Sequence, residues 1–235
     1  YEQITVLYAD VPLLRSETVE ALRRTHVYQN AAVTVLTFKP DEIKGLGRVI
    51  RDEDGSVTRI VEEAEVDKST KETNEANTGV YCFNGTWLWE NLGAVMPSSN
   101  NELYLTDLVA LASGQGEVVA DLLLEDETEA LGVNDRTQLA RAEAILRHRI
   151  CEKWMLAGVT ITDPLTTYID LEAKIGQDTM ILPNTHIQGD SVIGENCEIG
   201  PNSIIENGTV GEGCLIVSSV VRDSKLQDRV FVGPY

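Results

Sequence analysis

Hydrophobic residues change their spacing along this chain. Over the first part, short apolar runs alternate with stretches in which apolar residues recur every three or four positions. From residue 169 onward, aliphatic residues recur every six positions instead. Because neither an α-helix nor an ordinary hairpin has a period of six, the two parts are expected to fold differently.

The apolar runs of the first part predict β-strands at residues 4–8, 31–38, 79–83 and 118–124. The run at 31–38 is β-branched and nearly continuous, which is typical of a strand buried on both faces. Residues 48–61 are expected to form a hairpin, with Asp54 and Gly55 in its turn.

Apolar residues at helical spacing predict three helices. Ser16 is expected to cap a helix that buries Val19 and Leu22, and a second helix covers residues 104–112. A long third helix is expected from Asp135 to Gly158, with Gln138 placed as in a capping box. Strands that alternate with helices favour an α/β fold with a mainly parallel sheet.

The period of six predicts a β-helix in which each step forms one flat face of a triangular coil. Its unbroken section has isoleucine at 169, 175, 181, 187, 193 and 199. After a slip of one residue the ladder is expected to continue through Ile204, Val210 and Ile216. After a second slip it is expected to resume at Val220, Leu226 and Val232. All these side chains should point into the coil.

The two patterns predict three parts of the chain. Residues 1–134 form an α/β domain, 135–158 a connecting helix, and 159–235 the β-helix. Neither end has the features of a natural terminus, since the first residue is Tyr and the last falls inside the repeat array. We therefore expect a fragment that lacks both ends.

The composition of the chain limits the classes of function that it can have. The formal net charge of −19 argues against nucleic-acid binding, which needs a basic face, but leaves nucleotide substrates open. The sequence has no apolar run near the ~20 residues of a membrane helix, and no secretory leader opens it. The four cysteines lack metal-like spacing, so we expect free thiols in a reducing cytoplasm.

Two carbonyl-bearing side chains are candidate metal ligands. Asp10 follows an apolar strand at the carboxyl end, where open α/β sheets bind ligands, but it could equally be a turn residue before Pro12. Asn134 stands beside the cap of the long helix and could bind a metal or serve only in capping.

Three further residues suit a sugar. Gly47 would let the backbone approach a substrate, although a plain turn explains it too. Glu62 could accept hydrogen bonds from sugar hydroxyls or lie on a solvated face, and the amide of Asn77 can donate and accept. In the repeat array, His186 is expected at a polar coil corner rather than as a catalytic base.

Taken together, the motifs resemble one family over nearly the whole chain. They are LYADVPL, GLGRV, IVEE, NTGVY, ELYLTDLVALA, LGVNDRTQLARAE, LAGVTITDP and the hexapeptide array. The resemblance is to the bifunctional N-acetylglucosamine-1-phosphate uridylyltransferase / glucosamine-1-phosphate N-acetyltransferase. It implies a partial Rossmann-like nucleotidyltransferase domain followed by a left-handed parallel β-helix.

The resemblance also implies roles for individual residues. Asp10 and Asn134 would bind Mg²⁺, and Tyr8 and Ala9 would line the substrate beside them. Gly47, Glu62 and Asn77 would contact N-acetylglucosamine. Ala9 departs from the family pattern, which often has Gly there, and its methyl group narrows the room for backbone contact.

For the whole protein the resemblance implies two reactions in cell-wall precursor synthesis. UTP and N-acetylglucosamine-1-phosphate give UDP-N-acetylglucosamine and pyrophosphate, and acetyl-CoA acetylates glucosamine-1-phosphate. A homotrimer through the β-helix is implied, in the cytoplasm. The family's phosphate-binding loop and acetyltransferase residues lie outside the chain, so we expect the fragment itself to be inactive. Alternatives are an adenylyl- or guanylyltransferase for another sugar 1-phosphate, or a non-catalytic regulatory subunit.

Overall fold

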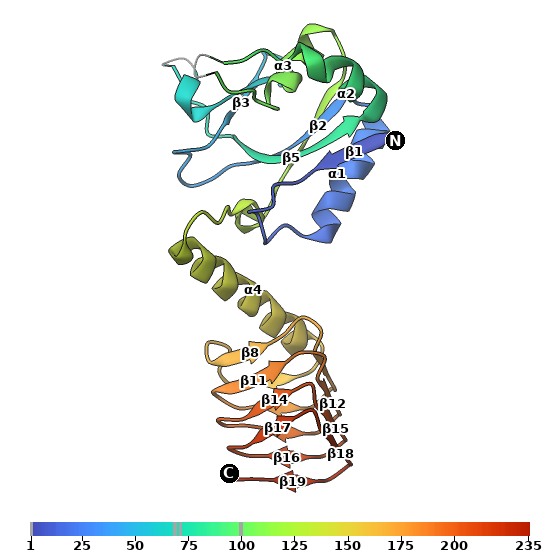
Figure 1. Cartoon of the computed structure of the whole chain (residues 1–235), viewed down its shortest axis with the longest axis vertical. Coiled ribbons are helices and arrows are strands. Elements are labelled where there is room, and N and C mark those ends of the chain that lie inside the picture. The colour runs from blue at the N-terminus through green and yellow to red at the C-terminus, as the bar shows by residue number, and fades with distance from the viewer. Residues whose placement is uncertain (1, 68–69, 71, 99–100) are drawn as a thin grey trace. The chain divides into compact units, whose positions relative to one another are not determined.

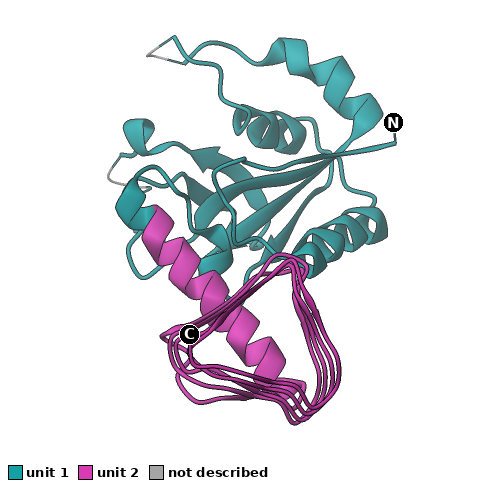
Figure 2. Cartoon of the chain, turned by 60° about the horizontal axis from the view of Figure 1, so that its bottom comes forward, with its two compact units in different colours: residues 1–138 teal, residues 139–235 magenta. Residues whose placement is uncertain are grey.

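The computed structural model describes residues 2–67, 70, 72–98 and 101–235. They divide into two compact units, residues 1–138 and 139–235, and each unit is described by itself (Figure 2). The first unit carries two hydrophobic clusters and the second carries one. No helix among the described residues is long and apolar enough to cross a membrane.

The first unit contains strands, α-helices and short 3-10 helices (η), which Figure 1 labels in part. In chain order they are β1 (Gln3–Val6), α1 (Ser16–Gln29), β2 (Val33–Phe38), β3 (Arg48–Arg51), β4 (Val57–Val61), η1 (Glu63–Glu65), β5 (Ala76–Asn84), α2 (Gly85–Asn91), η2 (Leu92–Ala94), α3 (Asp107–Gly114), β6 (Val119–Leu123) and η3 (Glu127–Ala130).

These strands form one sheet in the order β4-β3-β5-β2-β6, with β1 paired to β5 beside β3. Only the β2–β6 pair is parallel among the described pairs, so the expectation of a mainly parallel sheet is wrong. The reason lies in β5, which runs between β1 and β2 and opposite to both. No α-helix that the structure describes connects β2 to β5 as in a parallel crossover unit; the β3–β4 hairpin lies between them instead.

Most predicted elements of this unit are confirmed. Strand β2 is buried along its whole length, and the β3–β4 hairpin turns at Gly55, whose φ is +85°. Helix α3 begins three residues later than the predicted start at 104. The sequence analysis missed α2, which the side chain of Asn84 caps by accepting a hydrogen bond from the Trp87 amide.

The start of α1 differs from expectation as well. Ser16 is the first helical residue, and the capping position belongs to Arg15, whose side chain makes no capping hydrogen bond. The carboxylate of Glu129 takes that role from η3: its Oε2 accepts from the Arg15 amide at 2.9 Å and from the Thr18 hydroxyl at 2.6 Å. A residue distant in sequence thus caps this helix.

Helix α4 and the solenoid make up most of the second unit. In chain order the elements are α4 (Arg136–Leu156), β7 (Thr160–Ile161), β8 (Thr167–Ile169), β9 (Lys174–Ile175), β10 (Met180–Ile181), β11 (Thr185–Gln188), β12 (Val192–Ile193), β13 (Glu198–Ile199), β14 (Ile204–Glu206), β15 (Thr209–Val210), β16 (Leu215–Ile216), β17 (Val220–Arg222), β18 (Lys225–Leu226) and β19 (Phe231–Val232).

The solenoid strands stack into three parallel sheets, one on each face of a triangular coil (Figure 2). The capping position before α4 is held by Asp135, whose Oδ1 accepts from the amides of Thr137 and Gln138. Gln138 reaches the Asn134 amide instead of the Asp135 amide. The helix therefore has the expected capping side chains, but the Gln138 side chain bonds the amide one residue before the capping residue.

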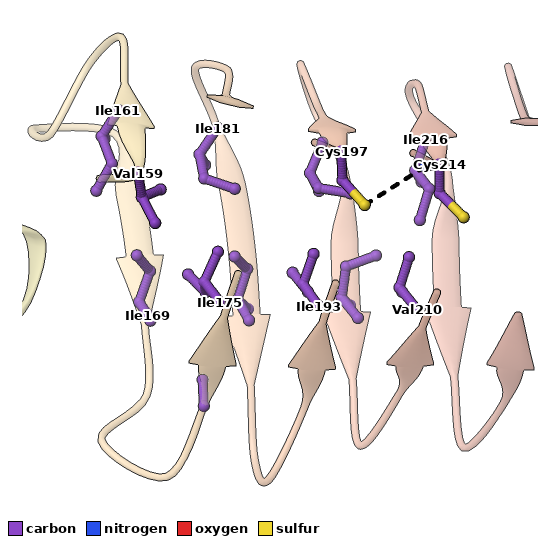
Figure 3. Close-up of a cluster of buried hydrophobic side chains, with 14 of the residues drawn as sticks. Val159, Ile161, Ile169, Ile175, Ile181, Ile193, Cys197, Val210, Cys214 and Ile216 are labelled. Atoms are coloured by element: carbon purple, nitrogen blue, oxygen red, sulfur yellow. Dashed lines mark hydrogen bonds between the residues drawn. The ribbon is translucent and has the colours of Figure 1, made fainter. Parts of the chain in front are cut away.

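The predicted β-helix is confirmed by its interior. All six isoleucines of the unbroken ladder are buried, each less than 8% exposed, and several stack in Figure 3. Two positions in the later ladder were wrong. Ile205 rather than Ile204 is fully buried, and Val221 rather than Val220 points inward, since Val220 is 59% exposed.

The inward positions are only five residues apart at three steps of the coil: from Ile205 to Val210, from Ile216 to Val221 and from Val221 to Leu226. The first and third of these steps lie at the same corner, between the sheet of β14 and β17 and the sheet of β15 and β18. Asn207 and Asp223 take positive φ values of 49° and 47° at these shortened turns. Short polar side chains tolerate that left-handed conformation.

A second inward ladder of small side chains stands two residues before the aliphatic one. Its buried members are Thr167, Ala173, Thr179, Thr185, Ser191, Cys197, Ser203, Cys214 and Ser219. Several of them bond the next coil: the Cys197 thiol donates to the Gly211 carbonyl at 3.1 Å, and the Cys214 amide donates to Cys197 Sγ at 3.4 Å (Figure 3). The thiols thus serve in packing, and all four cysteines of the chain are buried and free.

His186 lies within β11. The expectation that it stands at a corner of the coil is therefore wrong. Its ring stacks on Tyr168 of the preceding coil, with ring centroids 4.5 Å apart, and the Arg147 guanidinium lies over Tyr168 at 4.4 Å. The His186 ring is therefore occupied by stacking on an aromatic ring of the neighbouring coil.

Candidate functional site

The predicted sugar residues gather on one face of the first sheet. Asn77 and Tyr81 of β5 pair with Thr37 and Val35 of β2, which stand two residues apart, so both side chains share one face, with Gly79 between them. Gly79 has a φ of +80°, and a Cβ atom there would lie 2.2 Å from the ring of Tyr8. Only glycine leaves room for the Tyr8 ring, which lies directly on the strand.

Glu62 stands just beyond β4, and one hydrogen bond holds its carboxylate beside Gly47. Oε1 accepts a hydrogen bond from the Thr106 hydroxyl at 2.8 Å, and Thr106 itself is 2% exposed. A Cβ atom at Gly47 would lie 3.3 Å from Oε2. The Gly47 carbonyl in turn accepts a hydrogen bond from the backbone amide of Asn77 at 2.9 Å. Three of the predicted residues are thus joined into one structure.

The Asn77 side chain has a defined orientation. Its Oδ1 accepts a hydrogen bond from the Gly79 amide at 3.0 Å, which leaves the amide NH₂ group as the donor of the side chain. Burial raises the pKa of Tyr8, and the negative charges of Glu62 and Asp10 add to the rise. Tyr8 therefore stays a neutral phenol beside these carboxylates at physiological pH.

Asp10 and Asn134 lie on neighbouring loops. The carbonyl of Asp10 accepts a hydrogen bond from the amide of Val133 at 2.8 Å, and both Asp10 and Asn134 are exposed, as is Ala9. Two oxygen-bearing side chains on adjoining exposed loops suit Mg²⁺, which keeps several waters and uses few protein ligands. Among the described residues, no group of three or more His, Cys, Asp or Glu side chains is placed to bind a metal.

The same two loops are joined a second time through Glu129. The guanidinium of Arg15, on the Asp10 loop, pairs with Asp126 at 2.7 Å, while the Arg15 amide donates to Glu129. Glu129 is 4% exposed. Arg15 therefore pairs with two neighbouring carboxylates.

Three residues of this site escaped the sequence analysis: Thr106, Tyr81 and Glu129. Thr106 stood in the quoted ELYLTDLVALA segment and Tyr81 in NTGVY, so both were inside recognised motifs. The hydroxyl of Thr106 bonds Glu62, 44 residues away in sequence, and no local pattern reveals such a contact. Tyr81 was predicted only as part of a strand. Glu129 stands in an acidic segment of the sequence, and nothing in that segment distinguishes it from its acidic neighbours.

Two family models match parts of this chain. A family model described as nucleotidyl transferase matches residues 1–158. A second model, bacterial transferase hexapeptide (six repeats), matches residues 172–207. The first match covers the sugar-side residues, the Asp10 loop and the whole of α4.

Curated relatives match over the whole chain. Bifunctional protein GlmU of Heliobacterium modesticaldum is 45% identical over 100% of this chain and 51% of the relative. The protein of that name from Fervidobacterium nodosum is 46% identical, again over 100% and 51%. That from Geobacillus sp. (strain WCH70) is 44% identical over 98% and 50%. The chain spans about half the length of the curated relatives it matches.

Proposed function

The chain belongs to the nucleotidyl transferase family, and from this premise we propose that its first unit binds N-acetylglucosamine-1-phosphate for uridylyl transfer. The observation that carries the proposal is the Glu62 carboxylate, held by Thr106 beside Gly47 and Asn77. A fixed carboxylate accepts from sugar hydroxyls, and the neighbouring amide both donates and accepts.

In the proposed reaction an oxygen of the sugar phosphate attacks the α-phosphorus of UTP. The bond between that phosphorus and the oxygen bridging to the β-phosphate breaks, and pyrophosphate leaves. Such catalysis depends mainly on positioning and on charge neutralisation. Glu62 and Asn77 would orient the sugar, and Tyr8 would line the site beside the Asp10 loop.

Asp10 and Asn134 would hold Mg²⁺, and Ala9 would border the substrate. When bound, the ion supplies positive charge to the phosphates. The backbone contact between Asp10 and Val133, together with the Glu129 contacts, keeps the two ligand loops adjacent. We propose that this arrangement is formed by the protein before any ion binds.

For the whole protein we propose the second reaction of the family as well, acetyl transfer from acetyl-CoA to glucosamine-1-phosphate on the hexapeptide unit. A homotrimer through the β-helix and a cytoplasmic location belong to the same proposal. The hexapeptide match at residues 172–207 and the relatives' shared description as bifunctional support it.

The binding proposal can be tested by titration calorimetry of this chain with N-acetylglucosamine-1-phosphate, glucose-1-phosphate and mannose-1-phosphate. We expect the acetylated sugar to bind best. Glu62→Gln should weaken binding about 10- to 100-fold, because a hydrogen bond to a charged group contributes roughly 1.5–3 kcal/mol. The matched control is Glu53→Gln, on the exposed hairpin turn. Equal losses in both variants, or a preference for another sugar, would contradict the proposal.

Turnover is a separate question from binding. We propose that this chain alone does not release pyrophosphate from UTP and N-acetylglucosamine-1-phosphate with Mg²⁺. The basic residue on the Asp10 loop, Arg15, is paired with Asp126 and Glu129, so a phosphate would have to compete with two carboxylates for it. Pyrophosphate release at the rate of a full-length GlmU protein, measured in parallel, would refute this.

A further inference from the structure

Tyr81 carries a buried hydroxyl that makes no hydrogen bond of good geometry with any residue that the structure describes. The residue is 0% exposed, and its ring packs against Phe83 with centroids 5.6 Å apart. Leaving a buried polar group unpaired costs about 1–3 kcal/mol. Phenylalanine would pack the same space without that cost, as Phe83 does on the same face. The hydroxyl therefore requires an explanation.

The hydroxyl lies among the residues of the sugar site. Tyr81 stands on the same face of β5 as Asn77 and Gly79, and the Tyr8 ring covers Gly79. Burial raises the pKa of Tyr81 well above its usual range, the charges of Tyr8 and Glu62 add to the rise, and the Asn77 amide opposes it. The Asn77 side chain, which opposes the rise in the pKa, is the group that would donate to the Tyr81 oxygen.

We propose that Tyr81 is a positioning residue that acts through Asn77 when the sugar binds. Asn77 Oδ1 already accepts from the Gly79 amide, and in the sugar-bound state one N–H of the Asn77 side chain donates to the Tyr81 oxygen. The amide is then held at both ends, and one N–H and one lone pair remain for the sugar. Hydrogen bonds of binding sites are often loose before the ligand arrives.

This inference rests on the proposed sugar binding, but it makes its own prediction about stability. Removing a hydroxyl that has no partner in the free protein is nearly neutral or stabilising. Tyr81→Phe should therefore leave the thermal midpoint unchanged or raise it. It should also weaken N-acetylglucosamine-1-phosphate binding about 2- to 10-fold, the equivalent of one hydrogen bond. A merely structural hydroxyl would show the reverse of this pattern.

The matched control is Thr34→Val, which removes a buried hydroxyl that does have a partner. Thr34 Oγ1 lies 2.9 Å from Nδ1 of His26, on the opposite face of the sheet from Asn77. This variant should lose thermal stability and keep its affinity for the sugar phosphate. The comparison separates the effect of losing any buried hydroxyl from the effect of losing this one.

A double-mutant cycle tests the route through Asn77. Tyr81→Phe should have little further effect on affinity in an Asn77→Ala background, because the group it positions is gone. Unchanged affinity in Tyr81→Phe, a stability loss like that of Thr34→Val, or an equal affinity loss in both backgrounds would overturn the inference. If the unmodified chain binds none of the three sugar phosphates, the proposed function fails first, and this inference fails with it.

Discussion

A carboxylate can select a sugar only while its oxygens are kept in place. The hydroxyl of Thr106 performs this task for Glu62 from a position that solvent does not reach. Thr106→Val keeps the shape of the side chain and removes the hydrogen bond. We expect it to weaken N-acetylglucosamine-1-phosphate binding about tenfold, and Thr106→Ser to restore most of the loss. Calorimetry checks this, and failure of Ser to restore binding would point to packing instead.

Arg51 joins two carboxylates elsewhere on the same sheet. Its Nη2 lies 2.7 Å from Glu75 and 2.8 Å from Asp121, and its pKa is raised by the hydrogen bonds to both. Burial by itself would raise the pKa of Glu75, but the bonds from Arg51 outweigh it, so the pKa is lowered. The folded state therefore favours the ionised form of Glu75 over the protonated form.

The sign of the resulting pH dependence follows from linkage. A carboxyl with a lowered pKa in the folded state contributes stability above its unfolded pKa, near 4.3 for Glu, and loses it as pH falls further. Glu75→Gln should flatten the loss of stability between about pH 5 and pH 3. Urea unfolding of both proteins across this range measures it. Parallel curves would mean that the Glu75 pair contributes nothing to acid stability.

Arg51 itself should matter for stability at neutral pH. Arg51→Met should lower the free energy of unfolding by about 1–2 kcal/mol, less than for a fully buried pair because Arg51 is partly solvated. Arg59→Met, on the exposed side of β4, is the control and should change little. Urea unfolding at pH 7 distinguishes the two variants.

At the scale of elements, helix α1 depends on a cap from another part of the chain. Glu129 accepts from the Arg15 amide and the Thr18 hydroxyl, so Glu129→Ala leaves both donors unpaired. Loss of a cap costs about 0.5–2 kcal/mol, and the buried setting favours the upper end. Glu125→Ala, exposed in the same segment, is the matched control. Equal unfolding free energies for both variants would contradict the capping role.

The solenoid offers a similar comparison between neighbouring residues. Ile205 is fully buried, whereas Ile204 is only partly buried and faces outward. Ile205→Ala should cost about 2–5 kcal/mol because it leaves a cavity in the coil, and Ile204→Ala should cost much less. Unfolding in denaturant measures both. A larger effect at Ile204 would restore the inward ladder first expected from the sequence.

Period and alternation explain which elements could be predicted. The run at 31–38 and the six-residue ladder depend on local spacing, so both were correct. The slips were misplaced because Ile204 and Ile205, like Val220 and Val221, offer two equivalent aliphatic residues. The direction of β5 was missed because strand pairing joins residues far apart in sequence, which no local pattern encodes.

The residues of the candidate site divide in the same way, into those that local motifs reveal and those that only distant contacts reveal. Motifs supplied Asp10, Gly47, Glu62 and Asn77, and the structure places Gly47 beside Glu62 and bonds it to Asn77. The roles of these residues stay proposals. Thr106 could not be assigned from sequence, because a hydroxyl becomes a positioning group only through the partner that folding brings to it.

At the scale of the whole molecule, the two units have separate hydrophobic cores. The solenoid core includes Ile150 and Cys151 of α4, so most of that helix belongs to the second unit energetically. The clusters on the two faces of the first sheet share no residue with it. Cooperative unfolding requires shared packing, so units with separate cores commonly unfold in separate transitions.

We therefore expect two transitions in calorimetric unfolding of this chain, each sensitive to its own substitutions. Ile205→Ala should lower the midpoint of one transition, and Glu129→Ala should lower the midpoint of the other. Solenoid stability is carried by contacts between neighbouring coils, so a cavity in one coil weakens that unit as a whole. The sugar phosphate should raise only the midpoint that Glu129→Ala lowers, since a ligand stabilises the unit that binds it. A single transition shifted by both substitutions would show that the two units unfold together.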